Sequence, residues 1–341
     1  MVESNGIITQ ADKEALKLLH DFLPSKIFDM HFHPGKATFN PTVYKPGTCF
    51  SNIGTEITWT EYLRDQGRFY PEGFELRTNM IMNPDPAMFD GTGNMRRASV
   101  EFLVEELEKH PGSVAEVAVL AGDTREQIEE MLVHPRIRGF KCYHWTVDKP
   151  KTWDCTIGEY LPEAAWEIAN ERNLCITLHM VRDHALSDAK NLQYICEHAE
   201  KYPKARLILA HAARGFAAWT VVETVEKVAK YPNVYFDFSA VCEPTAFMAI
   251  IKACGHKRVF WGSDYPVTML RGTCASVGSS FLWLYKEQLD ACSSNTEFNA
   301  YLIGIQNLMA VRIACKLLDL DKKAVEDIFY NNAIEFFDLE K

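Results

Sequence analysis

The chain has 341 residues, 47% of them hydrophobic, and its 46 acidic and 36 basic side chains give a formal net charge of −10. This length and apolar content suffice for one large α/β domain or for two small ones. The acidic balance argues against a general binder of nucleic acid or of anionic membranes, because both need a basic surface. It still allows a local basic pocket for a small acidic molecule.

The cysteines and the start of the chain bear on the cellular compartment. The 10 cysteines are irregularly spaced and form no Cys-x-x-Cys pair. The beginning of the chain is polar, without the apolar core of a signal peptide, and no apolar run reaches the roughly 18 residues of a transmembrane helix. We therefore expect a cytoplasmic protein with reduced thiols and no membrane partner.

The first half of the chain predicts a helix followed by alternating strands and helices. The leading amphipathic helix covers 11–22 and ends before Pro24. Strands are expected at 26–31, 76–82, 114–120 and 137–142, with helices at 94–109 and 124–133. The long segment 34–73 is irregular, with a short helix near 58–66. Its aromatic residues indicate an ordered cover beside the first strand.

The second half continues the alternation and ends in helices. Strands are expected at 174–179, 205–211, 234–238 and 259–264, with helices at 158–172, 188–201, 215–230 and 244–253. Further helices are predicted at 280–290, 296–318 and 322–337. Eight alternating units predict a parallel (β/α)₈ TIM barrel, a fold of about 250 residues. We predict a single domain over 1–341, with the barrel at about 26–266 and the extra helices at about 280–341.

Two histidines end the first predicted strand, in Asp29-Met-His-Phe-His33. Side chains alternate along a strand, so His31 and His33 point to the same side. Pro34 ends the strand and places the pair at its C-terminal end. Two imidazoles on one face form half of a transition-metal site, although an isolated His-x-His also arises by chance.

Three other predicted strands end in residues of the same kind. His179 ends the fifth, His211 the sixth and Asp264 the eighth. The C-terminal ends of parallel barrel strands form one mouth, where catalytic groups from several strands meet. Burial of these polar groups without partners would be costly, so their joint occurrence predicts one site at the mouth.

Imidazoles with one carboxylate suit Zn²⁺ and leave a position open for water. The metal lowers the pKa of that water from about 15.7 to about 7, and Asp264 is then placed to accept its proton and pass it to the leaving group. Mn²⁺ tolerates the same ligands. We expect one divalent metal ion, with Zn²⁺ favoured over Mn²⁺.

The motifs at these strand ends resemble those of the amidohydrolase superfamily, in the amidohydrolase-related branch that includes aminocarboxymuconate-semialdehyde decarboxylase. The resemblance runs from about residue 26 to the end of the chain. The matching motifs are Asp29-Met-His-Phe-His33, Ile176-Thr-Leu-His179, Ile208-Leu-Ala-His211, Phe260-Trp-Gly-Ser-Asp-Tyr-Pro266 and Asn332-Ala-Ile-Glu-Phe336.

The resemblance implies roles for the strand-end residues. It implies that His31, His33 and His179 bind the metal, with Asp264 a further ligand or the general base. His211 would bind substrate or polarise the attacked bond, or else bind a second metal. Family members act on small molecules, and a basic pocket at the mouth would indicate that the substrate of this protein is an anion.

Four basic residues near the predicted mouth are candidates for substrate binding. Lys141 lies near the end of the fourth strand, where binuclear relatives carry a carboxylated lysine that bridges two metals, and where mononuclear relatives carry a lysine that need not bind metal. His144 follows on the loop and either faces the site or lies at the surface. Arg182 and Arg214 follow His179 and His211. Either arginine can hold a carboxylate bidentately, and a salt bridge to a loop acid explains them equally.

The leading functional prediction is a metal-dependent hydrolase acting on an amide, ester or lactone of a small, carboxylate-bearing substrate. The alternative is a non-oxidative decarboxylase of an aromatic or unsaturated acid on the same metal site. A barrel that has lost catalysis is the third hypothesis, and the complete ligand set argues against it. The helical C-terminal third leaves a homo-oligomer open.

Overall fold

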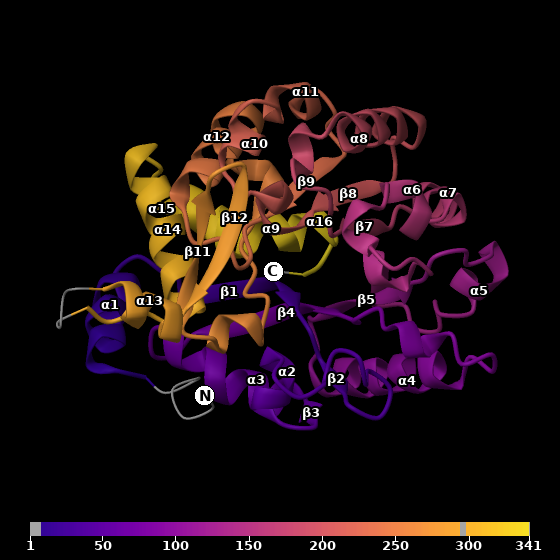
Figure 1. The fold of residues 1–341 in the computed structure, drawn as a ribbon, viewed down its shortest axis with the longest axis horizontal. Helices are drawn as coiled ribbons and strands as arrows, with labels where there is room; N and C mark the ends of the chain where they lie inside the picture. The colour runs from indigo at the N-terminus through magenta and orange to yellow at the C-terminus, as the bar shows by residue number, and fades with distance from the viewer. Residues whose placement is uncertain (1–7, 294–297, 341) are drawn as a thin grey trace.

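Eight parallel strands form the centre of this structure, a computed structural model that describes residues 8–293 and 298–340 (Figure 1). Each strand pairs with the next one along the chain. Their bounds are β1 Lys26–Phe32, β4 Glu75–Ile81, β5 Val114–Val119, β6 Ile137–Cys142, β7 Cys175–Leu178, β8 Arg206–Leu209, β9 Val234–Asp237 and β10 Val259–Phe260. All eight predicted strands are present in the predicted order.

The last strand closes onto the first. The backbone N–H of Met30 donates to the carbonyl of Trp261 at 3.0 Å, and that of Asp264 donates to the carbonyl of His31 at 2.7 Å. Phe32 and Tyr265 extend the contact as a parallel bridge. The predicted (β/α)₈ TIM barrel is therefore confirmed, with helices around its strands (Figure 1).

The predicted helices of the barrel are present, several of them shorter or divided. Their bounds are α1 Gln10–His20, α4 Asn94–Lys109, α5 Arg125–Glu129, α6 Ile157–Tyr160, α7 Glu163–Arg172, α8 Ala189–Lys201, α10 Trp219–Val222, α11 Val225–Ala229 and α12 Pro244–Cys254. The single helix expected over 158–172 is divided because Pro162 has no N–H to continue α6. The helix expected over 215–230 is divided at Thr224, whose φ of −132° is not helical.

The segment after β1 forms short elements at the rim of the barrel. A two-stranded ladder pairs β2 Gly35–Lys36 with β3 Glu56–Ile57, and α2 Cys49–Ile53 lies between them in sequence. The predicted short helix is confirmed as α3 Trp59–Gln66. Thr48 and Asn52 of this segment face the cavity described below, so the segment does border the mouth.

The helix predicted at 280–290 is wrong over its first half. An antiparallel hairpin lies there, made of β11 Gly272–Val277 and β12 Ser280–Tyr285, and α13 begins only at Lys286 and ends at Cys292. Phe281, Trp283 and Tyr285 alternate with other residues, which is the period of a strand and not of a helix. Gly278, with a φ of +59°, makes the tight turn between the strands.

The last two predicted helical regions differ from the structure in their start and in their continuity. The helix expected over 296–318 is α14 Ile303–Leu317; residues 298–302 are not helical, and 296–297 lie outside the described residues. Leu302 instead pairs with Arg271 in an antiparallel bridge, which takes its backbone out of the helix. The region 322–337 consists of α15 Lys322–Glu326, a π-helical turn η8 Asp327–Asn331, and α16 Asn332–Phe336.

The C-terminal segment closes the N-terminal end of the barrel. The ring of Phe336 packs edge-on against Tyr235 and Phe260, with centroids 4.7 and 5.0 Å apart, and Phe337 lies 5.9 Å from Phe28. These partners lie on β1, β9 and β10. No helix in the described part of the chain combines the length and apolarity needed to cross a membrane.

Candidate active site

Three predicted metal ligands meet at the C-terminal end of the barrel. His31 Nε2 lies 3.1 Å from His33 Nε2, and Asp264 Oδ1 lies 3.7 and 3.4 Å from these two nitrogens. All three side chains are buried. Two ligand atoms on one tetrahedral zinc ion lie about 3.4 Å apart, so these spacings fit a single metal ion.

The hydrogen bonds of the two imidazoles support a metal site. His33 Nδ1 lies 2.9 Å from the carbonyl oxygen of Ile81, which can only accept, so Nδ1 carries the ring proton. His31 Nδ1 lies 3.1 Å from the carboxylate of Asp237 and is protonated for the same reason. Both Nε2 atoms therefore present lone pairs to each other and to Asp264. Such a group of acceptors calls for a cation among them.

Electrostatics hold these ligands in the required charge states. Burial lowers the pKa of His31 to about 3, and Lys141 adds to the effect while Asp237 opposes it. Burial would raise the pKa of Asp264, but His211, His33 and His31 together bring it below its ordinary value. At neutral pH the imidazole is neutral and the carboxylate charged, which are the forms that bind metal.

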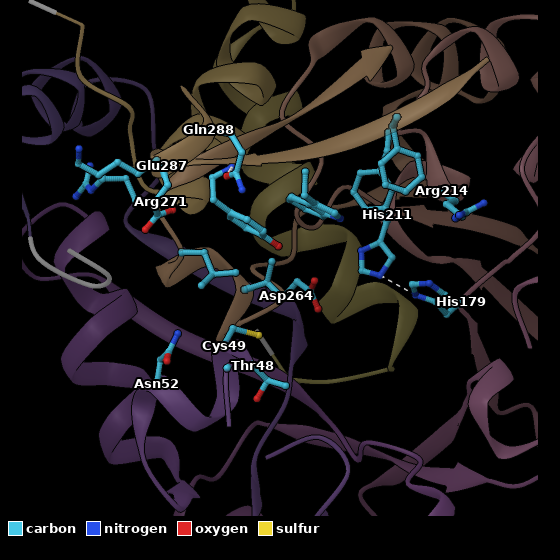
Figure 2. A pocket seen from close by; sticks show the side chains of 18 of the residues that line it. Thr48, Cys49, Asn52, His179, His211, Arg214, Asp264, Arg271, Glu287 and Gln288 are labelled. Atoms are coloured by element: carbon cyan, nitrogen blue, oxygen red, sulfur yellow. Dashed lines mark hydrogen bonds between the residues drawn. The ribbon is translucent and has the colours of Figure 1, made fainter. Parts of the chain in front are cut away.

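His179 and His211 lie together beside this group. His179 Nδ1 is 3.2 Å from His211 Nε2 (Figure 2). Among the described residues, His31, His33 and Asp264 form one group whose ligand atoms all lie within 4.8 Å of one another. His179 is not a member of that group. Burial lowers the pKa of both His179 and His211, so both rings are neutral at pH 7. The structure thus places His179 at the site, in direct contact with His211.

Asp237 and Ser239, which the sequence analysis did not single out, tie the two histidine groups together. Asp237 is the last residue of β9 and accepts from His31 Nδ1, from the backbone N–H of His211 at 3.2 Å and from the Ser239 hydroxyl. The Ser239 oxygen lies 2.9 Å from His211 Nδ1 and 3.2 Å from His31 Nδ1. Burial opposes ionisation of Asp237, but His31 brings its pKa far below the usual range. The strand-end rule used for the other strands, applied to the seventh, would have found Asp237.

His211 begins an unusual backbone turn. The four residues from His211 to Arg214, labelled α9 together with Ala210, have φ between +52° and +58°, the left-handed region that costs L-residues about 1–2 kcal/mol each. The bond from the His211 N–H to Asp237 and one from the Gly215 N–H to the His211 carbonyl at 2.7 Å hold the turn. A Cβ on Gly215 would lie 2.7 Å from the carbonyl oxygen of Ala212. The turn directs both His211 and Arg214 to the cavity.

Lys141 lies under the site, inside the barrel. Its Nζ is 3.3 Å from His31 Nε2, and burial lowers its pKa. The buried Glu116 on β5 accepts hydrogen bonds from Asn79 at 2.6 Å and Thr177 at 2.8 Å. Lys141 therefore contacts one of the candidate metal ligands from inside the barrel.

The two arginines, Arg182 and Arg214, differ in their partners and in whether they face the cavity. The Arg182 guanidinium pairs with Asp188 at 2.9 Å and donates to the Asp154 carbonyl, so it makes the loop salt bridge that the sequence left open. Arg214 is 7% exposed and faces the cavity, with a hydrogen bond to the Arg182 carbonyl. Among the described residues, no carboxylate lies within ion-pair distance of Arg214. It is therefore available to a substrate anion.

His144 is buried beside the cavity and does not line it. Its Nδ1 lies 2.8 Å from the Thr152 hydroxyl, and its Nε2 is buried without a hydrogen-bond partner. Burial and the nearby Arg214 lower the pKa of His144 to about 4. The ring packs against Trp153 with centroids 4.3 Å apart.

A cavity of about 630 Å³ opens over these residues (Figure 2). Its inner part contains Asp264, His179, His211 and Arg214, as Figure 2 shows. Aromatic side chains form much of its wall: Tyr143, Trp153, Phe216, Phe281, Trp283 and Tyr285. This size suits a small organic molecule.

Glu116→Gln is expected to remove a pH-dependent destabilisation. Burial, opposed by the bonds from Asn79 and Thr177, raises the pKa of Glu116 from 4.5 to about 7. The folded protein then holds this proton more tightly than the unfolded chain, so the free energy of unfolding falls as the pH rises from 4.5 to 7. Relative to the Gln variant, the free energy of unfolding of the wild type should fall by about 3 kcal/mol between these two pH values.

Denaturant unfolding at several pH values measures this difference. Glu101→Gln, on the exposed face of α4, is the matched control and should leave the pH dependence unchanged. A wild-type-minus-variant difference that does not vary between pH 4.5 and 8 would show that Glu116 titrates normally.

Comparison with known proteins agrees with this geometry. The family model described as Amidohydrolase matches residues 29–339. The chain therefore belongs to the amidohydrolase family, and it is an enzyme of that superfamily, whose members are metal-dependent. The resemblance seen in the strand-end motifs is confirmed.

The individual proteins that match share little sequence identity with this chain. L-fucono-1,5-lactonase from Burkholderia ambifaria is 25% identical over 179 residues, which cover 47% of this chain and 57% of that protein. Among solved structures, an amidohydrolase from Burkholderia multivorans with bound zinc has a TM-score of 0.57 at 12% identity, over 92% of this chain and 99% of that one. The 5-carboxyvanillate decarboxylase from Sphingomonas paucimobilis has a TM-score of 0.59 at 12% identity, over 93% and 100%. At these identities the structural neighbours share the fold.

Proposed function

We propose that this protein is a metal-dependent hydrolase of an amide, ester or lactone that carries a carboxylate. One observation supports this most strongly: the group of His31, His33 and Asp264 lies beside a cavity that also holds the buried Arg214, which has no acidic partner within the described part of the chain. Zn²⁺, or Mn²⁺ in its place, would be held by His31, His33, His179 and Asp264. The ion would supply a Lewis acid that makes hydroxide available at neutral pH.

The side chains take distinct roles in this proposal. Arg214 binds the substrate carboxylate through its guanidinium. Asp264 accepts a proton at its carboxylate during the attack and returns it to the leaving group. His211 faces the cavity next to His179 (Figure 2), and we assign to it contact with the bond that is broken. Lys141 contacts His31 from beneath, and His144 packs against Trp153 in the cavity wall. Arg182 supports Arg214 through its backbone carbonyl.

The alternative reaction, decarboxylation of an aromatic or unsaturated acid, uses the same side chains. It would require the site to deliver a proton to carbon instead of accepting one from water. The position of Arg214 at the cavity and the fold shared with 5-carboxyvanillate decarboxylase favour it as the second candidate. Hydrolysis and decarboxylation would both take a small acid as the substrate.

A single panel of assays tests the proposal. Protein loaded with Zn²⁺ is incubated with a lactone that carries carboxylates, 2-pyrone-4,6-dicarboxylate, with the neutral L-fucono-1,5-lactone for comparison, and with 2,6-dihydroxybenzoate. Acid release and CO₂ release are measured separately. We expect acid release from a lactone, its loss after treatment with a chelator, and its recovery when Zn²⁺ or Mn²⁺ is added back. CO₂ release without hydrolysis would favour the alternative.

Metal analysis accompanies the assay. We expect one equivalent of metal per chain. Two equivalents would mean that Lys141, His179 and His211 hold a second ion. A content below about a few tenths of an equivalent, in protein purified without chelator, would overturn the proposal, since the family's chemistry depends on metal.

A further inference from the structure

The hairpin of β11 and β12 forms one wall of the cavity. Phe281, Trp283 and Tyr285 alternate along β12, so their side chains share one face, and all three line the cavity. The intervening Leu282 points away and is 52% exposed. The hairpin therefore presents an aromatic face inward and an aliphatic residue outward.

This aromatic wall continues down to the candidate catalytic residues. The ring of Phe216 lies 4.8 Å from Phe281, 5.2 Å from Trp283 and 5.5 Å from the ring of His211, centroid to centroid. A molecule in contact with His211 is thus also beside the rings that the hairpin brings in.

The same wall encloses the proposed carboxylate anchor. The Arg214 guanidinium carbon lies 5.1 Å from the centroid of Phe281 and 5.5 Å from that of Trp153. Both rings lie within cation–π distance of the guanidinium, so the proposed anchor is in contact with the aromatic wall. When Arg214 holds the carboxylate of a ligand, the rest of that ligand lies against the hairpin.

We propose that Phe281 and Trp283 are specificity-determining residues, which bind the flat ring of the substrate while Arg214 holds its carboxylate. This inference rests on the proposed function, since it assumes that the cavity is the substrate site. Stacked aromatic contacts favour a planar partner over a puckered one of equal size, because a flat ring meets the wall over its whole face. The preferred ligand is therefore a small acid with a flat, conjugated ring.

Two acids of equal size separate ring shape from charge. Benzoate and cyclohexanecarboxylate carry the same carboxylate, one on a flat ring and the other on a puckered ring. Binding of each to the metal-loaded protein is measured by calorimetry, without any turnover. We expect the wild type to bind benzoate about three- to tenfold more tightly.

Substitutions on β12 locate the preference. Trp283→Leu and Phe281→Leu keep an apolar side chain and should each reduce the benzoate preference to less than about twofold, with little change in the binding of cyclohexanecarboxylate. Leu282→Ala lies on the same strand, faces outward and should retain the full preference. Circular dichroism checks that each variant is folded.

The outcomes distinguish this inference from the proposed function. If neither acid is preferred by the wild type, or if both Leu variants keep the preference, the inference is overturned. Failure of every lactone assay with the preference intact would overturn only the hydrolase proposal, because ring selection is measured by binding alone.

Discussion

His31→Ala is expected to abolish both metal binding and turnover. In the proposed site the side chain would offer Nε2 to the metal, and the contact of its Nδ1 with Asp237 at 3.1 Å fixes the ring in that orientation. Loss of a ligand should reduce metal affinity by more than the roughly 10–100-fold that removal of an outer partner costs. Metal content by mass spectrometry and kcat/KM after added Zn²⁺ measure the effect.

His179→Ala sharpens this test. Its Nδ1 contacts His211, and it lies outside the group formed by His31, His33 and Asp264. We expect this variant to lose metal as His31→Ala does, as the proposed ligand set requires. The exposed His20→Ala on α1 is the control and should keep full metal content. Full metal retention by the His179→Ala protein would remove His179 from the ligand set.

Asp264→Asn is expected to keep much of the metal and lose turnover. Its carboxylate lies 3.4 Å from His33 Nε2 and is held in the ionised form by the surrounding histidines. An amide keeps a ligand oxygen but cannot accept a proton, and loss of general base catalysis typically costs about 10²–10⁴-fold in rate. Single-turnover rates alongside metal content separate the two effects.

The control for Asp264→Asn is Asp148→Asn, an exposed carboxylate on the loop after β6. It should change neither quantity. If Asp264→Asn instead loses the metal in proportion to its activity, the carboxylate acts mainly as a ligand. The role of proton acceptor would then pass to another group in the cavity, and His211, which lines the same cavity, is the next candidate.

Local patterns predicted the barrel and the convergence at its mouth. Strand periodicity and the polar residue at each strand end are local signals that can be read from the sequence. Parallel topology then brings His31, His33 and Asp264 to the same end of the barrel, independently of the conformation of the loops. The geometry confirms this convergence. The roles proposed for these residues await the variants above.

Other features depend on contacts between distant segments. Arg182 and Arg214 looked equivalent in sequence, and only the fold pairs Arg182 with Asp188 and leaves Arg214 to the cavity. A helix was expected over 280–290, where residues 280–285 are the strand β12, because the aromatic period of two there runs directly into the true helix α13. Nothing in Ala212-Ala213 predicts left-handed backbone, since glycine is the usual residue there.

The left-handed turn links two functions that are separate in chemistry. The same four pairs of backbone torsions fix the direction of His211 and of Arg214. A change in this turn would move the imidazole and the carboxylate anchor together, so the chain cannot alter its reach for a longer or shorter acid here without also displacing a catalytic group. We therefore expect evolution toward new substrates to proceed through the hairpin wall, which carries neither His211 nor Arg214, while the turn stays fixed.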